Sequence, residues 1–184
     1  VYAEMEAHPY TIFQILTKRP MTLRRYVVDR YRGCGVPAHL WHGVSVEDDR
    51  VTSRIDTLRA MKDELGAFTA FLSVEPLIGT VAKHRYDGID QVLIGGESGP
   101  NARPMALQSA QRSRDEARRV GAAVWFKQFG TWPNNPLYAE SNARLHFDRV
   151  RHAIERGERE ASLEPHPKTG RLVVSGEKGG ATLD

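Results

Sequence analysis

The chain has 184 residues, of which 40% are hydrophobic and 27% charged, a composition typical of a globular domain that can bury a core. A single cysteine, Cys34, excludes an internal disulfide framework and any metal site that needs several cysteines of this chain. The net charge of +3 permits a nucleic-acid or phosphate-bearing partner without requiring one. No apolar run has the length of a membrane span, so we expect a cytoplasmic protein that does not bind membranes.

Strand-like and helix-like segments alternate along most of the chain. Runs rich in apolar and β-branched residues predict strands at 11–16, 40–46, 68–74, 91–94 and 122–126. Helical patterns predict helices at 21–31, 50–62 and 106–120, the last with many arginines on its outer face. The repeat of roughly 30 residues is typical of βαβ units in a parallel sheet or barrel.

We therefore predict an α/β fold: a partial TIM-type (β/α) barrel with parallel strands, spanning residues 1–130. The first ten residues resemble the tail of a helix that leads into a strand, so we expect the barrel to be truncated at the N-terminus. After Gly130 the sequence becomes rich in tryptophan, proline, asparagine, glycine and charged residues. We predict that residues 131–184 form a C-terminal extension that is partly helical or disordered.

Three local predictions accompany this fold. Asp48 or Asp49 is expected to cap the helix that begins at Arg50, and Gly121 is expected to terminate the helix at 106–120. The aromatic residues of the strands are expected to serve packing rather than base stacking; these are Trp41, Trp125 and Phe126.

The stretch at 89–105 is the most informative part of the sequence. Its short buried strand changes abruptly into Gly95-Gly96-Glu97-Ser98-Gly99-Pro100. Glycines at such a position allow a ligand to approach the backbone closely. The alternative is an ordinary strand-to-helix turn, in which paired glycines are common.

Four other predicted strands also end in polar residues. Since the carboxyl ends of parallel strands meet on one side of a sheet, a concave polar site is expected there. Carboxylates would accept hydrogen bonds from ribose hydroxyls or an ammonium, and the cations would hold a phosphate or carboxylate. Alternatively, Glu75 and Lys127 form a structural ion pair. The candidate ligand-binding residues are Lys18, Arg19, Ser45, Glu47, Glu75, Gly95, Gly96, Glu97, Ser98, Arg103, Lys127 and Gln128. The sequence indicates no catalytic residue and no metal ligand.

Five blocks at these strand ends together resemble the phage Gp37/Gp68 family, described as a domain of unknown function. The blocks are FQILTKRP (13–20), WHGVSVEDD (41–49), FLSVEPLIG (71–79), VLIGGESGPNARPM (92–105) and VWFKQFG (124–130). The family is similar to radical S-adenosylmethionine enzymes, which use a TIM-type barrel. The resemblance implies a [4Fe–4S] centre held by an upstream cysteine cluster, and S-adenosylmethionine bound to one of its irons. This chain does not contain that cluster.

Two functions follow as hypotheses. In the first, the chain is the C-terminal part of a radical S-adenosylmethionine-like protein, with a nucleotide or S-adenosylmethionine site at the strand ends and no cofactor of its own. In the second, it is a non-catalytic module whose basic helix at 106–120 and C-terminal extension contact nucleic acid or a protein. A weaker third option is an enzyme that uses Lys18 or Lys127 as a covalent amine. Exposed strand edges of a partial barrel also predict self-association or a covering segment.

Overall fold

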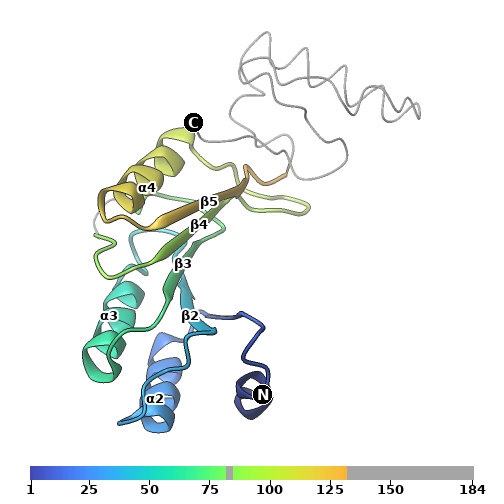
Figure 1. Cartoon of the computed structure of the whole chain (residues 1–184). Coiled ribbons are helices and arrows are strands. Elements are labelled where there is room, and N and C mark those ends of the chain that lie inside the picture. The colour runs from blue at the N-terminus through green and yellow to red at the C-terminus, as the bar shows by residue number, and fades with distance from the viewer. Residues whose placement is uncertain (82–84, 132–184) are drawn as a thin grey trace, which may run out of the picture.

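The computed structural model describes residues 1–81 and 85–131, which form one parallel sheet covered by helices (Figure 1). The sheet has five strands in the order of the sequence. The strands are β1 (Phe13–Thr17), β2 (Leu40–Ser45), β3 (Ala70–Val74), β4 (Gln91–Gly95) and β5 (Ala123–Gln128). The helices are α1 (Tyr2–Glu6), α2 (Pro20–Tyr31), α3 (Ser53–Leu65) and α4 (Leu107–Arg119). The predicted α/β class with parallel strands is confirmed.

The three long helices α2, α3 and α4 lie on the same face of the sheet (Figure 1). This arrangement follows from the strand order, because each right-handed crossover to the next neighbouring strand places its helix on the same side. A consecutive parallel order with helices on one face is the arrangement found in (β/α) barrels. In the described part of the chain β1 and β5 do not pair, so closure into a barrel stays a prediction. The predicted C-terminal extension lies outside the described residues, apart from Thr131.

The predicted helix boundaries are correct to within three residues, and their local signals act mostly as expected. Pro20 begins α2, and Gly121 follows α4 with a φ of 75°, a conformation that glycine adopts readily. The capping prediction for α3 is wrong. Thr52 is the N-cap, and Asp48 instead accepts a hydrogen bond from the Arg50 amide at 2.8 Å, which stabilises the loop before the helix. Asp49 accepts a bond from the Thr80 hydroxyl at 2.7 Å.

The two faces of the sheet have different roles. The helix-covered face carries the main hydrophobic core, with residues such as Val44, Leu72 and Ile94 fully buried. On the opposite face Phe71 lies against Gly43, where a Cβ would meet three ring atoms at 2.5–2.6 Å. Glycine is therefore required at position 43 for the ring to lie across β2. The cluster that forms the main core does not include Phe71.

The face opposite the helices is concave. Gln14 on β1 donates a hydrogen bond to Gln91 on β4 at 3.4 Å, although β2 and β3 lie between these strands. Side chains on a flat sheet stand roughly perpendicular to it, so this contact requires curvature toward the open face. Trp125 lies on the same face and is 62% exposed. Among the described residues, the prediction that Trp125 serves packing is wrong, because none of their helices covers this side of β5.

The short helix α1 is held against α2 and β2, which confirms that a helix leads into the first strand. Arg30 donates two hydrogen bonds to the Glu6 carboxylate at 2.7 and 2.5 Å, and the Tyr31 hydroxyl donates a third at 2.5 Å. Tyr2 stacks on the buried His42, with its hydroxyl oxygen 3.1 Å from Nε2. Desolvation by burial lowers the pKa of His42 to about 4.

This burial predicts that the fold loses stability in mild acid. Because the pKa of His42 falls from an ordinary 6.5 to about 4 on folding, its contribution is complete above pH 6.5 and is lost as the pH falls toward 4. The difference between the two pKa values corresponds to about 3 kcal/mol. We expect urea unfolding to show a falling free energy of unfolding across this window and a smaller fall in His42→Phe. An NMR titration of folded His42 with a midpoint near 6.5 would contradict this.

Candidate functional site

Strand register gathers most of the predicted site residues on the concave face, at the carboxyl edge of the sheet. Ser45 on β2 pairs with Ser73 on β3, so both side chains lie on the same face, opposite the helices. Glu47 lies two residues after Ser45, and Glu75 lies two residues after Ser73. All five strands run in one direction, and the segments after them therefore meet at one edge.

Glu47 is held by cations from two different elements. Lys18, just after β1, places its Nζ 2.5 Å from Oε1, and Arg54 in α3 places Nη1 3.0 Å from Oε2. The same Nη1 donates to the Ser45 carbonyl oxygen at 2.8 Å. Both carboxylate oxygens of Glu47 are thus engaged. The sequence prediction omitted Arg54, which lies in the first turn of α3.

Glu75 is held in a similar way from the far edge of the sheet. Lys127 on β5 places Nζ 2.7 Å from Oε2, and the Gln128 amide donates to Oε1 at 3.1 Å. Gln128 is only 3% exposed, and its amide also donates to the Gly96 carbonyl oxygen at 3.1 Å. The alternative that Glu75 and Lys127 form an ion pair is confirmed. Gln128 fixes the orientation of Glu75 within this pair.

Glu97 and Arg103 join the two ends of the loop after β4. Arg103 donates from Nε to Oε2 at 2.8 Å and from Nη2 to Oε1 at 2.5 Å, and its backbone amide donates to Oε2 at 2.8 Å. The pKa of Glu97 is lowered to about 2, mainly by these hydrogen bonds from Arg103, and the nearby charge of Lys18 makes a smaller contribution. The ends of β1 and β4 are therefore within electrostatic reach of each other. Glu97 stays ionised at every physiological pH.

The two glycines after β4 have structural reasons to be glycine. A Cβ at Gly96 would lie 2.1 Å from the carbonyl oxygen of Phe129, so the backbone that follows β5 occupies this space. A Cβ at Gly95 would lie 2.9 Å from the Glu75 carboxyl carbon, Cδ. The predicted role of these glycines was close approach of a ligand to the backbone. Protein atoms take that place here, and the glycines allow the Glu75 and Phe129 contacts instead.

Two predicted residues lie apart from these groups. The backbone amide of Arg19 donates to Thr17 Oγ1 at 3.0 Å as α2 begins, and its side chain is exposed. Ser98 is exposed in the loop after β4. Within the described residues, neither side chain contacts another predicted site residue. The structure thus brings together ten of the twelve candidates and leaves Arg19 and Ser98 outside.

The site offers donors rather than acceptors to a ligand. The oxygens of Glu47, Glu75 and Glu97 are all engaged, as given above. An ammonium has three N–H donors, and Lys18 and Lys127 each use one of them in these pairs. Across the described ranges we find no group of three or more His, Cys, Asp or Glu side chains that would hold a metal ion. Chemically, the arrangement suits a ligand with hydrogen-bond acceptors.

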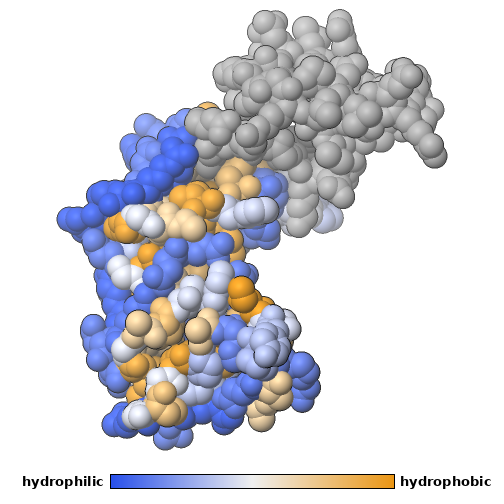
Figure 2. Space-filling view, in the orientation of Figure 1, coloured by the Kyte–Doolittle hydropathy of each residue, from blue (hydrophilic) through white to orange (hydrophobic). Residues whose placement is uncertain are grey.

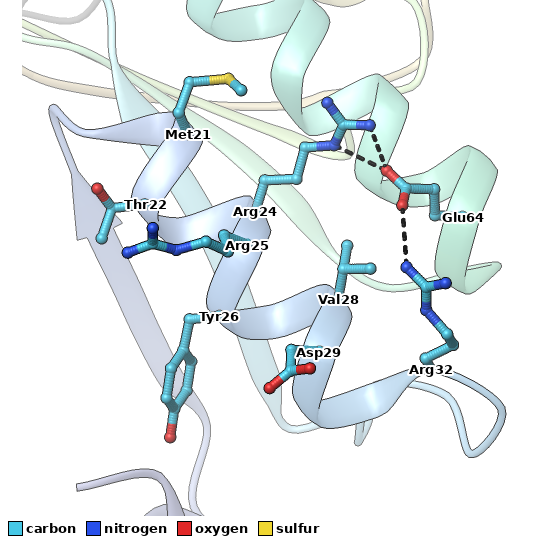
Figure 3. A pocket seen from close by; sticks show the side chains of 9 residues that line it. All are labelled: Met21, Thr22, Arg24, Arg25, Tyr26, Val28, Asp29, Arg32 and Glu64. Carbon is cyan, nitrogen blue, oxygen red and sulfur yellow. Dashed lines mark hydrogen bonds and ion pairs between the residues drawn. The ribbon is translucent and has the colours of Figure 1, made fainter.

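A second hollow lies on the opposite, helix-covered side and was not predicted from the sequence. It has a volume of about 720 Å³, and most of the residues that line it belong to α2 (Figure 3). Arg24 and Arg32 both point toward Glu64 of α3, at 2.6 and 3.9 Å (Figure 3). None of the predicted site residues lines this hollow. Its lining residues are Met21, Thr22, Arg24, Arg25, Tyr26, Val28, Asp29, Arg32 and Glu64.

In the described residues, no helix combines the length and the hydropathy that crossing a membrane requires. A family model described as "Protein of unknown function (DUF5131)" matches residues 1–169. No curated protein and no solved structure matches the chain.

The two glycines provide a direct test of the structural assignment. Gly96→Ala forces a Cβ against backbone atoms, and we expect it to lower the free energy of unfolding by about 3 kcal/mol, the upper part of the range for overpacking. Gly95→Ala is the matched control, since its Cβ meets a side chain that can move, and about 1 kcal/mol is expected. Chemical denaturation of both variants measures the difference. Equal stability of the two would show that Gly96 is not packed against Phe129.

Proposed function

The chain belongs to the DUF5131 family, and we propose that it binds a nucleotide-type ligand, S-adenosylmethionine or a related nucleoside, at the carboxyl ends of its strands. The observation that carries the proposal is the set of charged pairs at this edge. Lys18–Glu47 and Lys127–Glu75 join strands across the sheet, and Glu97–Arg103 holds the loop after β4. Ligand sites of parallel α/β proteins are built at this edge.

The side chains of this edge suit such a ligand in two respects. Lys18 and Lys127 keep N–H donors for a carboxylate or phosphate, and their carboxylate partners hold them in place. The concave face beside them carries exposed apolar surface, including Leu16 and Trp125, against which a planar ring can lie. A pocket with apolar walls and a few convergent polar groups is the usual form of a small-molecule site.

We also propose that the chain is related to the phage Gp37/Gp68 and radical S-adenosylmethionine-like proteins, because the five strand-end blocks resemble theirs. The residues present do not fit the iron–sulfur cluster of that chemistry, which needs several thiolates. Cys34 is the single cysteine, and it lies in the turn between α2 and β2, at the amino end of the strands. We therefore assign ligand binding to this chain and no reductive step.

A second candidate function is a non-catalytic module that contacts nucleic acid or a protein through α4. The surface over α4 is strongly hydrophilic (Figure 2). Arg112 and Arg118 are exposed there, and neither forms an ion pair with another described residue. Arginines without carboxylate partners are available to phosphate groups. Self-association belongs to the same proposal, since Ile12 and Leu16 are exposed at β1, whose outer edge pairs with no other described strand.

Isothermal titration of the 184-residue chain with S-adenosylmethionine tests the first function. We expect binding that weakens about tenfold in Lys18→Met and in Lys127→Met, because each loses one charged hydrogen bond of about 1.5 kcal/mol. Arg25→Met, on the outer surface of α2, removes the same charge away from the strand ends and is the matched control. Equal weakening in all three variants would indicate a general charge effect and would contradict a site at the strand ends.

The second function is tested by titrating the same chain with a single-stranded oligonucleotide. The module is favoured if the oligonucleotide binds to the wild-type chain but not to the double variant Arg112→Met/Arg118→Met, and if S-adenosylmethionine gives no heat of binding. Binding of S-adenosylmethionine that is unaffected by this double substitution would favour the nucleotide site.

A further inference from the structure

Ser45 and Ser73 form an adjacent pair of hydroxyl groups on the concave face. They are register partners on neighbouring parallel strands, which lie about 4.8 Å apart. Each residue is only 4% exposed. In the part of the chain that the structure describes, neither hydroxyl has a hydrogen-bond partner, although buried polar groups are normally paired.

These hydroxyls remain accessible from the open face of the sheet. Among the described residues, the side-chain polar atoms that are both sealed from solvent and without a partner are His42 Nδ1 and Gln128 Oε1. The serine hydroxyls are not in this group, although they have no partner among the described residues. They therefore keep a small exposure to solvent, on the face opposite the helices.

The surroundings of the pair are rich in donors. Glu47 and Glu75 follow the two serines by two residues each, and these carboxylates bring Lys18 and Lys127 to the two sides of the pair. The carboxylate oxygens are all occupied, whereas both ammonium groups keep unused N–H donors. Lys18, Arg54 and Lys127 also outnumber Glu47 and Glu75, so these paired side chains together carry a net positive charge.

We propose that Ser45 and Ser73 form a subsite for an anionic group of the ligand, a phosphate or a carboxylate. Each hydroxyl donates its O–H to one oxygen of this group, and Lys18 and Lys127 balance the charge. A cationic group at the same place would be repelled by Lys18, Arg54 and Lys127, which already pair with Glu47 and Glu75. The inference rests on the proposed function, because it assigns one part of the same nucleotide-type ligand.

The test compares ligands that differ only in the anionic group. Adenosine 5′-monophosphate is paired with adenosine, and S-adenosylmethionine with decarboxylated S-adenosylmethionine, each titrated calorimetrically into the wild-type chain. We expect the member that carries the anionic group to bind at least tenfold more tightly in at least one pair, and this pair identifies phosphate or carboxylate as the group. In Ser45→Ala/Ser73→Ala that preference should fall to less than threefold, with the affinity of the member without the anionic group unchanged.

Two further variants separate binding from folding. Ser73→Thr keeps the hydroxyl and should keep the preference, whereas Ser53→Ala, an exposed serine of α3, should change nothing. If the ligands without the anionic group bind but the double variant keeps the full preference, the subsite is overturned and the proposed function stands. If none of the four ligands binds to folded wild-type protein, both are overturned. If the double variant does not fold, the single variants Ser45→Ala and Ser73→Ala take its place in the test. Each is expected to lose part of the preference for the anionic group.

Discussion

The parallel register of the five strands is the constraint on which the rest of the structure depends. Register decides which side chains share a face, and a shift by one residue would transfer every side chain of a strand to the other side. Here the pairing of Ser45 with Ser73 places both serines opposite the helices. The same register aligns Val44 with Leu72 in the core. Because burial of the core requires this register, it also decides which side chains lie on the concave face.

The concave face differs between its two ends. Toward the amino end, Phe71 lies over Gly43, and the Gln14–Gln91 hydrogen bond spans β1 to β4. At the carboxyl end, one charged pair connects strands that are not neighbours, because Lys127 on β5 contacts Glu75 after β3, with β4 between them. These contacts close one end with packed side chains and leave polar donors at the other. The same edge is where parallel sheets generally place their ligands.

The sequence predicted the fold class because its main signals are periodic. Buried parallel strands and amphipathic helices alternate, and the edge at which their polar ends meet follows from strand direction alone. The sequence did not predict contacts between segments far apart in the chain. Gly96 looked like a ligand-facing glycine because the Phe129 carbonyl that fills its space is 33 positions away. The capping prediction for Asp48 failed for a local reason: α3 begins at Ser53 and not at Arg50, so Asp48 lies in the loop, where it accepts a hydrogen bond from the Arg50 amide.

Trp125 and Arg54 show the same difference between local and tertiary information. A tryptophan in an apolar strand normally packs, but the exposure of Trp125 depends on which face the helices cover. Arg54 looked like an ordinary helix residue, and its contact with Glu47 requires the turn between β2 and α3 to bring it back over the strand end. In both cases the side-chain type was readable from the sequence and its neighbours were not.

The central claim is that the carboxyl edge of the sheet, and not the hollow on α2, is the binding surface. Amide chemical-shift mapping of the ¹⁵N-labelled chain, titrated with adenosine 5′-monophosphate, tests this most directly. The account predicts shifts confined to the residues at 17–18, 45–47, 73–75, 95–97 and 127–128. Shifts that instead cluster on α2, around Arg24 and Arg25, would contradict it.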